Sequence, residues 1–494
     1  MAEKLKVAFI ASECAPYAKT GGLGDVVGAL PGALNRLGHE VIVIIPLYQQ
    51  IDQALFNIKP YLSPVGVWMG DGQEWCSVHQ TRNKDAVPVY FINYEKYFLR
   101  EGIYHDYGFN DYKDNPKRFA FLSKAGLQVC VDIGFKPDVV HLHDWHTAIS
   151  AAYLKTWFRD HDLLDRTKSV LTIHNIGYQG KYSHEFFPYL GFQESDFTSD
   201  KFEDFGDINF LKGGIQYSDM ITTVSPKYAA ETRTPQGGMG LAPYLNDKSD
   251  RYLGILNGID DRVWNPSVDP LIPANYSSED LKGKKKCKKA LQARLNLDST
   301  QKVPIIGVIS RFVEQKGLDL LAQVVDRVLS NMAVQFAILG SGQKDLETYF
   351  SNLPYQYPGS VGCHIGYDNE LSHLIEAGSD FFAMPSRYEP CGLNQLYSLK
   401  YGSLPIVRAT GGLDNTVEQY DETNGKGTGF KFMEASTNAL YYTIGWAVST
   451  FYDRHDHFLQ MQKRGMKQDF SWDRSALEYE KVYRLSQAFT RDFK

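Results

Sequence analysis

Residues 19–26 read Lys19-Thr20-Gly21-Gly22-Leu23-Gly24-Asp25-Val26 and stand between two apolar patterns. The run 6–12 before them has the composition of a buried strand, and the apolar residues from Val26 to Leu37 recur at helical spacing. We therefore predict a strand, a glycine turn and a helix. Glycines at such a junction let the backbone approach a ligand, and the free N–H groups of the helix start attract anions such as phosphate.

Taken alone, this stretch is more simply explained as an ordinary turn with a solvated lysine. Its glycine spacing matches neither the dinucleotide-binding fingerprint nor the phosphate-binding loop of NTPases. An NAD-dependent oxidoreductase is therefore the least favoured enzyme class.

Length and composition indicate a large globular protein. A chain of 494 residues exceeds one ordinary core, so we predict two large domains. The formal net charge of -6 gives no general attraction to nucleic acid or to an anionic membrane. No apolar segment approaches the roughly 20 residues that span a bilayer. We expect neither a nucleic-acid partner nor a membrane.

The six cysteines are scattered, without a C-x-x-C pair or metal-ligand spacing. We therefore expect a reducing, cytoplasmic location and no metal site. The start resembles a signal peptide only superficially, because its apolar run soon reaches Glu13 and continues into the glycine turn. The few residues before the first strand fit a bacterial protein; a plastid protein whose transit peptide was removed is the alternative.

Strand-like and helix-like patterns alternate in both halves of the chain, which favours parallel, doubly wound sheets. The predicted strands are 40–46, 138–143, 169–174, 220–224, 304–310, 334–339, 380–385 and 404–408. We predict an α/β protein with one Rossmann-like domain over 1–253, a second over 254–472, and a C-terminal helix over 473–494 that packs back on the first. The two domains are expected to face each other across a ligand-binding cleft. The lysine run 282–289 is interpreted as a solvated face of a short helix.

Two stretches of the second half place polar groups just after predicted strands. The positive charges of Arg311 and Lys316 would stabilise a leaving diphosphate. It is equally plausible that both are surface residues paired with acidic side chains. Residues 385–396 bring Glu389 and a Pro-Cys-Gly turn before a helix start, an arrangement that suits a sugar and a phosphate side by side. Alternatively, Glu389 is only a carboxylate favoured by the helix dipole. A further glycine turn, 410–413, is expected to face the first one.

In the first half, residues 141–146 read His141-Leu142-His143-Asp144-Trp145-His146. A metal site is the tempting interpretation, but the third histidine is irregularly placed and no carboxylate-histidine helix motif accompanies the group. We prefer a hydrogen bond from His146 to a polyol, with Trp145 as packing. His174-Asn175 fits a second wall of that pocket, or a structural histidine nearly as well.

Five stretches together strongly resemble the bacterial glycogen synthase and plant starch synthase family. They are 19–26, His143-Asp144-Trp145-His146, Gly254-Ile255-Leu256-Asn257-Gly258-Ile259-Asp260, Ser310-Arg311 with Lys316-Gly317, and Glu389-Pro390-Cys391-Gly392-Leu393. The resemblance covers the whole chain in order. It implies a retaining GT-B glucosyltransferase that needs no metal or other cofactor and extends an α-1,4-glucan, or a maltooligosaccharide primer, at its non-reducing end with ADP-glucose.

Carried over by position, the resemblance implies that Lys19, Gly21 and Gly22 bind the donor. Arg311 and Lys316 would hold its diphosphate. Glycosyl transfers share an oxocarbenium-like transition state. The acceptor 4-hydroxyl would attack from the face that ADP leaves.

The same resemblance places Glu389 beside the transferred glucose, where it would support the cationic transition state. His146 and Asn257 would contact the hydroxyls of that glucose, and Tyr367 looks like the ring that stacks on adenine. The loop and helix start Cys391, Gly392, Leu393, Asn394 and Gln395 would complete the donor site.

Two departures from related patterns concern this loop. Position 394 is Asn where many relatives have Thr, and the Glu-x7-Glu pattern of some other GT-B families is absent because Tyr397 and Ser398 stand near the place of its second Glu. Cys391 has no neighbouring His or Lys in sequence, so a packing or backbone role is preferred to a nucleophile. The alternatives are a GT-B transferase that uses UDP-glucose or a small acceptor, and an inactive glucan-binding relative.

Overall fold

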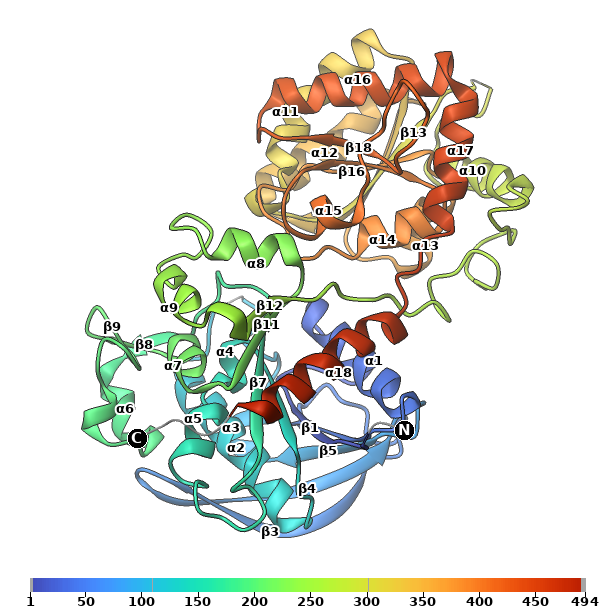
Figure 1. Ribbon diagram of the computed structural model, residues 1–494. Coiled ribbons are helices and arrows are strands. Elements are labelled where there is room, and N and C mark those ends of the chain that lie inside the picture. Colours follow the sequence, from blue (N-terminus) through green and yellow to red (C-terminus); the bar gives the residue numbers. More distant parts are fainter. Residues whose placement is uncertain (1–2, 109, 301, 490–494) are drawn as a thin grey trace. The chain divides into compact units, whose positions relative to one another are not determined.

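The computed structural model describes residues 3–108, 110–300 and 302–489, and the chain divides into two compact units (Figure 1). The first unit comprises the described residues of Met1–Val224, Ala229–Gly258 and Trp472–Lys494. The second comprises those of Ser225–Tyr228 and Ile259–Ser471. Residues 490–494, with which the predicted C-terminal helix ends, lie outside the described residues.

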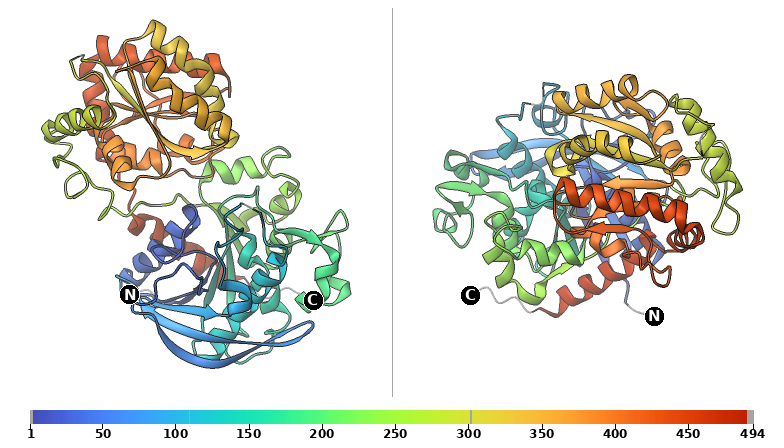
Figure 2. Two further views of the ribbon diagram at one scale, coloured as in Figure 1. Left: turned by 180° about the vertical axis from the view of Figure 1, so that it is seen from behind. Right: turned by 90° about the horizontal axis from the view of Figure 1, so that it is seen from above.

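The large sheet of the first unit runs in the order β12-β11-β7-β6-β1-β2-β5-β4-β3. Pairing is parallel from β12 to β5 and antiparallel between β5, β4 and β3, so the long hairpin of β3 and β4 forms one edge of this sheet (Figure 2). The strands are β1 (Lys6–Ile10), β2 (Glu40–Pro46), β3 (Lys59–Met69), β4 (Gly72–Arg82), β5 (Pro88–Asn93), β6 (Val139–His143), β7 (Lys168–Ile173), β11 (Met220–Thr223) and β12 (Tyr252–Gly254).

Helices cover the parallel part of this sheet, which explains why its central strands are almost continuously apolar rather than alternating. Val7, Phe9 and Ile10 of β1 are fully buried. The helices are α1 (Gly22–Arg36), α2 (Glu95–Phe98), α3 (Asn115–Asp132), α4 (Asp144–Ala148), α5 (Ser150–Lys155), α6 (Phe187–Leu190), α7 (Phe210–Tyr217), α9 (Ala242–Asp247) and α18 (Trp472–Ala488). A small sheet of β8 (Lys181–Ser183), β9 (Glu203–Asp204) and β10 (Asp207–Asn209) lies apart from the large one.

The C-terminal helix α18 belongs to the first unit, where it lies beside α1 (Figure 1). Arg36 of α1 forms an ion pair with Asp473 at 2.6 Å. Deeper in the unit, the Tyr483 hydroxyl lies 2.8 Å from Nδ1 of His141 on β6. These contacts tie α18 to α1 and to β6, the strand that ends in the histidine motif.

The sheet of the second unit is entirely parallel and runs in the order β15-β14-β13-β16-β17-β18. Its strands are β13 (Ile305–Phe312), β14 (Gln335–Gly342), β15 (Val361–Ile365), β16 (Phe381–Met384), β17 (Leu404–Arg408) and β18 (Phe430–Phe432). One core packs α11 (Leu318–Asn331), α12 (Lys344–Gln356), α16 (Thr437–Asp453) and α17 (His455–Met466) against the sheet. A second core lies on the side of α10 (Lys282–Arg294) and α13 (Asn369–Gly378), and the short helices α14 (Asn394–Lys400) and α15 (Gly411–Thr416) follow β16 and β17.

Helix α8 (Pro226–Thr232) spans the boundary between the two sets of residues. Within the described residues, none of the helices has the length and apolar composition of a membrane span.

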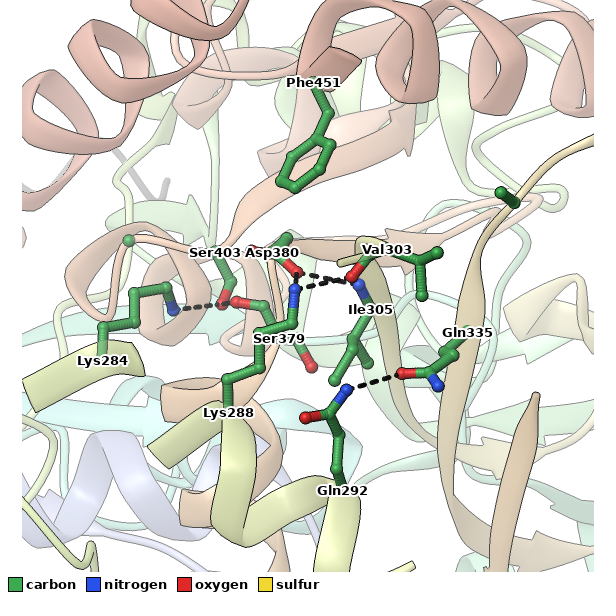
Figure 3. Close-up of polar contacts among 12 residues, drawn as sticks. Lys284, Lys288, Gln292, Val303, Ile305, Gln335, Ser379, Asp380, Ser403 and Phe451 are labelled. Atoms are coloured by element: carbon green, nitrogen blue, oxygen red, sulfur yellow. Dashed lines mark hydrogen bonds and ion pairs between the residues drawn. The ribbon is translucent and has the colours of Figure 1, made fainter. Parts of the chain in front are cut away.

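The lysine run on α10 is partly structural, which corrects the interpretation of residues 282–289 as a solvated face. Lys284 is buried and donates to the carbonyl oxygens of Ala377 and Tyr401 at 3.0 and 2.9 Å. It also donates to Oγ of Ser403 at 3.1 Å (Figure 3). Lys288 forms an ion pair with Asp380 at 2.6 Å (Figure 3). The sequence pattern could not reveal this role, because the acceptors lie on distant segments.

We expect Lys284→Ala to destabilise the second unit, because it removes a charged donor from three buried acceptors, of which the Tyr401 carbonyl keeps a hydrogen bond from the Tyr276 hydroxyl at 2.8 Å. Unsatisfied buried groups of this kind cost about 2 kcal/mol, and the loss is larger when the donor is charged. For a domain of this size that corresponds to roughly 4–8 °C in Tm. Calorimetry checks this against the matched control Lys285→Ala, whose side chain is exposed on the same helix. Equal melting temperatures for the two variants would contradict the structural role.

Candidate functional site

A buried carboxylate organises the glycine turn of the first unit. Glu13 follows β1, and its oxygens accept hydrogen bonds from the Thr20 amide at 2.6 Å, the Thr20 hydroxyl at 2.7 Å and the Gly21 amide at 3.2 Å. A Cβ on Gly24 would lie 3.2 Å from the same carboxylate, which keeps that position small. The turn is therefore wrapped around Glu13 before α1 begins.

The predicted ligand-binding glycines lie on the outside of this turn. Apart from neighbouring residues, no atom lies within 4 Å of a Cβ placed on Gly21 or Gly22, so the Cα positions of these two glycines border open space. The half-exposed Lys19 ammonium is held by Asp25 at 2.7 Å, and burial raises the pKa of that carboxyl group while Lys19 lowers it. The turn before α1 and the start of that helix thus place a lysine beside two glycines with free space around them.

Glu13 also connects the glycine turn to the histidine motif. The Tyr104 hydroxyl donates to Glu13 at 2.5 Å, and the Tyr104 ring stacks on His146 with centroids 4.6 Å apart. His146 is buried in α4, and burial lowers its pKa well below the usual value. Its Nδ1 has no hydrogen-bond partner among the described residues. A neutral imidazole with an open nitrogen is suited to a hydrogen bond with a ligand hydroxyl.

The other residues of the motif maintain the shape of this strand end. Asp144 has a positive φ of 52° and accepts the His174 amide at 2.6 Å, and burial raises its pKa to about 7. His143 and His174 lie 3.0 Å apart, Nδ1 to Nε2. Trp145 packs on Gly180, where a side chain would collide with the indole. Within the described residues, no group of three or more His, Cys, Asp or Glu is placed to hold a metal ion.

Asn257, also predicted to bind sugar, follows β12 in the same unit. The residue is buried, and its side-chain oxygen has no hydrogen-bond partner among residues of the described ranges. A buried amide oxygen of this kind needs a donor, and a ligand hydroxyl can supply one.

In the second unit, a cavity of about 150 Å³ lies at the C-terminal ends of β13 and β16. The Lys316 ammonium bridges both oxygens of Glu389, at 2.8 and 2.7 Å, and the Ser386 hydroxyl donates to the same carboxylate at 3.0 Å. Arg311 is exposed and makes no side-chain hydrogen bond or ion pair with the described part of the chain. The cavity is therefore lined by the Lys316–Glu389 ion pair and by the Arg311 guanidinium, which has no ionic partner among the described residues.

The loop after Glu389 divides into residues that line the cavity and residues that brace it. The residues that line it are Gly392, Leu393 and Asn394. The side-chain amide Nδ2 of Asn394 donates to the Ile309 carbonyl at 2.7 Å. Gln395 is fully buried and donates to the carbonyl oxygens of Cys391 and Gly392 at 3.1 and 3.0 Å. Cys391 and Gln395 therefore shape the loop, and neither lines the cavity.

The second glycine turn lies beneath that loop. Gly411 and Gly412 are buried, and side chains there would collide with the carbonyl oxygens of Glu389 and Cys391. The Gly412 amide donates to the Glu389 carbonyl at 3.1 Å. These glycines allow close approach of two backbones and hold Glu389 in place. The expectation of a turn open to a ligand is wrong for these two residues.

Tyr367 lies outside this cavity, on the loop after β15. Its side chain is 86% exposed, and its hydroxyl donates to Asn369 at 3.2 Å. The structure thus groups Arg311, Lys316 and Glu389 with residues 392–394, and places Tyr367 at the surface of the same unit.

Sequence reasoning missed Glu13, Tyr104 and Ser386. Glu13 had a usable signal, since a carboxylate between a strand and a glycine turn can accept the turn's amides. Tyr104 had none, because it lies in an irregular segment 91 residues from its partner Glu13.

The sequence matches two family models, described as starch synthase catalytic domain over residues 6–247 and glycosyl transferases group 1 over residues 291–447. Glycogen synthase 1 of Geobacter sulfurreducens is 46% identical over 97% of this chain and 96% of its own. Glycogen synthase of Bacillus subtilis is 41% identical over 99% of both chains. The chain belongs to the glycogen and starch synthase family.

Solved structures agree with this family assignment. The catalytic domain of starch synthase IV from Arabidopsis thaliana, bound to ADP and acarbose, has a TM-score of 0.90 and 35% identity, covering 99% of this chain and 100% of that one. A sucrose-phosphate synthase from Thermosynechococcus elongatus, at 17% identity and a TM-score of 0.60, shares the fold. The predictions of an α/β fold of GT-B type and of a retaining glucosyltransferase of the glycogen and starch synthase type, which uses ADP-glucose, are confirmed.

We expect Glu13→Gln to lower kcat/KM for glucosyl transfer by about tenfold to a hundredfold, because hydrogen bonds to a charged acceptor are worth about 1.5–3 kcal/mol. The amide keeps the size of the carboxylate but has one acceptor oxygen instead of two and no charge. Initial rates of ADP release measure the effect. Glu40→Gln, at a partly exposed carboxylate on β2, is the control. Unchanged kinetics of the Glu13→Gln variant would show that the turn does not need its buried charge.

Proposed function

We propose that the cavity of the second unit binds the diphosphate and the glucosyl group of ADP-glucose. The observation that carries this proposal is the Lys316–Glu389 pair at 2.7 Å, set beside the uncommitted Arg311 in one cavity. Two cations suit a departing diphosphate, whose charge grows as the glycosidic bond breaks. The carboxylate suits the positive charge that develops on the glucosyl group.

In this mechanism the acceptor 4-hydroxyl attacks from the face that ADP leaves, so that configuration is retained. Arg311 and Lys316 stabilise the leaving group, and Glu389 stabilises the oxocarbenium-like transition state. Lys316 already neutralises Glu389, so the cavity holds its charges in place before the donor binds. Such preorganisation avoids a reorganisation of charges at the moment of reaction.

The first unit supplies the remaining contacts in this proposal. Lys19, Gly21 and Gly22 would bind the donor. His146 and Asn257, each with a buried polar atom that has no hydrogen-bond partner among the described residues, would contact glucose hydroxyls. Tyr367, with a largely free ring, would stack on adenine.

The partners we propose are ADP-glucose and an α-1,4-glucan or maltooligosaccharide primer. Residues 1–253 would form the acceptor side, 254–472 the nucleotide-sugar side, and 473–494 a helix of the first domain. We expect no nucleic-acid or membrane partner, and no metal or other cofactor in the reaction.

Arg311→Ala is the clean test of the cation pair. The exposed Arg311 side chain makes no hydrogen bond or ion pair with the described residues. Its removal breaks no such contact, so the variant should fold normally. We expect kcat to fall by about a hundredfold or more, the usual effect of removing a group that stabilises transition-state charge. Lys344→Ala, at a similarly exposed lysine in the same unit, should be unaffected. A near wild-type rate for the Arg311→Ala variant would refute its role.

The donor and acceptor are tested directly by radiolabel transfer. ADP-glucose and UDP-glucose are compared on maltooligosaccharide primers and on a monosaccharide acceptor, with and without EDTA. We expect transfer from ADP-glucose to the oligosaccharide, insensitive to the chelator. Preference for UDP-glucose or for the small acceptor would favour another GT-B transferase, and no release of ADP with any primer would favour an inactive glucan-binding relative.

A further inference from the structure

A second concave site lies in the first unit and shares no lining residue with the cavity described above. It is an open groove between the turn of the β3–β4 hairpin and the segments that follow α5 and α6. Its volume is about 460 Å³, within the range of small-molecule and cofactor sites. The residues that define it are Trp68, Gly70, Trp157, Gly191 and Glu194. We call these residues the tryptophan groove.

The two indoles of the tryptophan groove are unusually exposed for their type. Trp68 is 56% exposed and Trp157 is 46% exposed, although tryptophan is highly buried on average. Exposed aromatic surface that lines a concave site is characteristic of binding sites. The groove thus offers two large apolar ring faces to a ligand.

Trp157 is fixed in position from two sides. Its indole N–H donates to the Gly191 carbonyl at 2.9 Å, and the amino group of the buried Lys124 lies 3.0 Å from the ring centroid. The Lys124 nitrogen has no hydrogen-bond partner among the described residues, and it contacts the face of Trp157 and, at 5.0 Å, the ring of Tyr153. With its edge and one face engaged, the indole forms a rigid platform that needs no ordering when a ligand arrives.

Two glycines form the floor between the indoles. A side chain on Gly70 would collide with the Pro188 carbonyl, and one on Gly191 would lie 3.0 Å from the Trp157 ring. Gly191 also has a positive φ of 74° where α6 ends. The hairpin turn and the α6 loop therefore meet backbone to backbone, which leaves the groove open between its aromatic walls.

The rim of the tryptophan groove supplies polar groups. Glu194 carries an exposed carboxylate, which lies 3.6 Å from His184 and has accepting capacity left for hydroxyl donors. Flat apolar faces combined with hydrogen-bonding groups at their edges match the two surfaces of a pyranose ring, its C–H faces and its equatorial hydroxyls. Neither a run of basic residues nor a deep apolar channel lines the groove, which disfavours anionic or lipid ligands.

We propose that the tryptophan groove is a glucan-binding site, separate from the reaction centre, that stacks glucose units of an α-1,4-glucan on Trp68 and Trp157. The identity of the sugar rests on the proposed function, because the polymer that the enzyme extends is the glucan it meets at high local concentration. Binding at a second site on the same molecule converts later encounters with chain ends into events at high effective concentration. The groove therefore favours long, branched acceptors over short ones.

The test compares three tryptophan variants by native electrophoresis in gels that contain glycogen. We expect Trp68→Ala and Trp157→Phe to weaken retention, by about fivefold for the alanine, since one aromatic contact is worth roughly 1 kcal/mol. Trp75→Ala is the matched control, because Trp75 is 53% exposed on the same hairpin but does not line the groove. All three variants should keep the wild-type kcat on maltotetraose, and only the groove variants should show a raised KM for glycogen.

Three outcomes would overturn the proposal. They are wild-type retention of the Trp68→Ala variant, equal weakening in the Trp75→Ala control, and a change in molecular mass by light scattering in place of weaker retention. The last outcome would identify the groove as a contact between copies of the chain. Thermal unfolding shows whether Trp157→Phe remains folded, and Trp68→Ala, at the surface, gives the decisive result. Failure of the proposed function is distinct, since it would appear as no ADP release by the unmodified protein on any primer.

Discussion

Glu13 and Glu389 are both buried carboxylates, and the loops that form the candidate sites are arranged to satisfy them. An unpaired carboxylate in such surroundings costs several kcal/mol, on the order of 3–5 when a buried pair is broken. In the first unit, amide and hydroxyl groups of Thr20, Gly21 and Tyr104 provide the compensation. In the second, Lys316 and Ser386 provide it. Each loop conformation is therefore determined by a charge placed a few residues after a strand.

The two arrangements differ in what remains available to a ligand. Around Glu13 the donors are neutral groups, and the half-exposed Lys19, paired with Asp25, lies beside glycines whose Cα positions border open space. Around Glu389 the main partner is Lys316, whose third proton and positive field remain accessible from the cavity. Loss of Lys316 would also leave Glu389 buried without its cation, whereas Arg311 has no such structural duty.

The sequence was sufficient to predict the elements that local pattern controls. The predicted strand 40–46 coincides with β2 and 404–408 with β17, because continuous apolar runs are typical of parallel strands covered on both sides. The grouping of Arg311, Lys316 and Glu389 in one cavity also followed from their positions at strand ends. Short edge strands such as β18 were missed, since three residues give little periodic signal.

Long-range contacts account for the errors. The sequence pattern predicts Lys284 to be a surface residue. In the structure it is buried, and it donates to carbonyl groups about a hundred residues away in the sequence. Gly411 and Gly412 look like an open turn until the Glu389 loop is placed against them. Cys391 and Gln395 stand in a stretch with a strong family resemblance, and only the packing separates these bracing residues from the neighbouring residues that line the cavity.

The exposed aromatic residues illustrate a difference in preorganisation. Tyr367 is 86% exposed and held by one hydrogen bond of 3.2 Å to a neighbour, so a base that stacks on it must also restrict its motion. Trp157 is already restrained by Gly191 and Lys124, so a ligand gains the contact without that entropic loss. Ordering on binding is useful where interactions should strengthen only as the reaction proceeds. A rigid platform is useful where the task is retention alone, and Trp157 therefore suits the glucan-binding role proposed for the tryptophan groove.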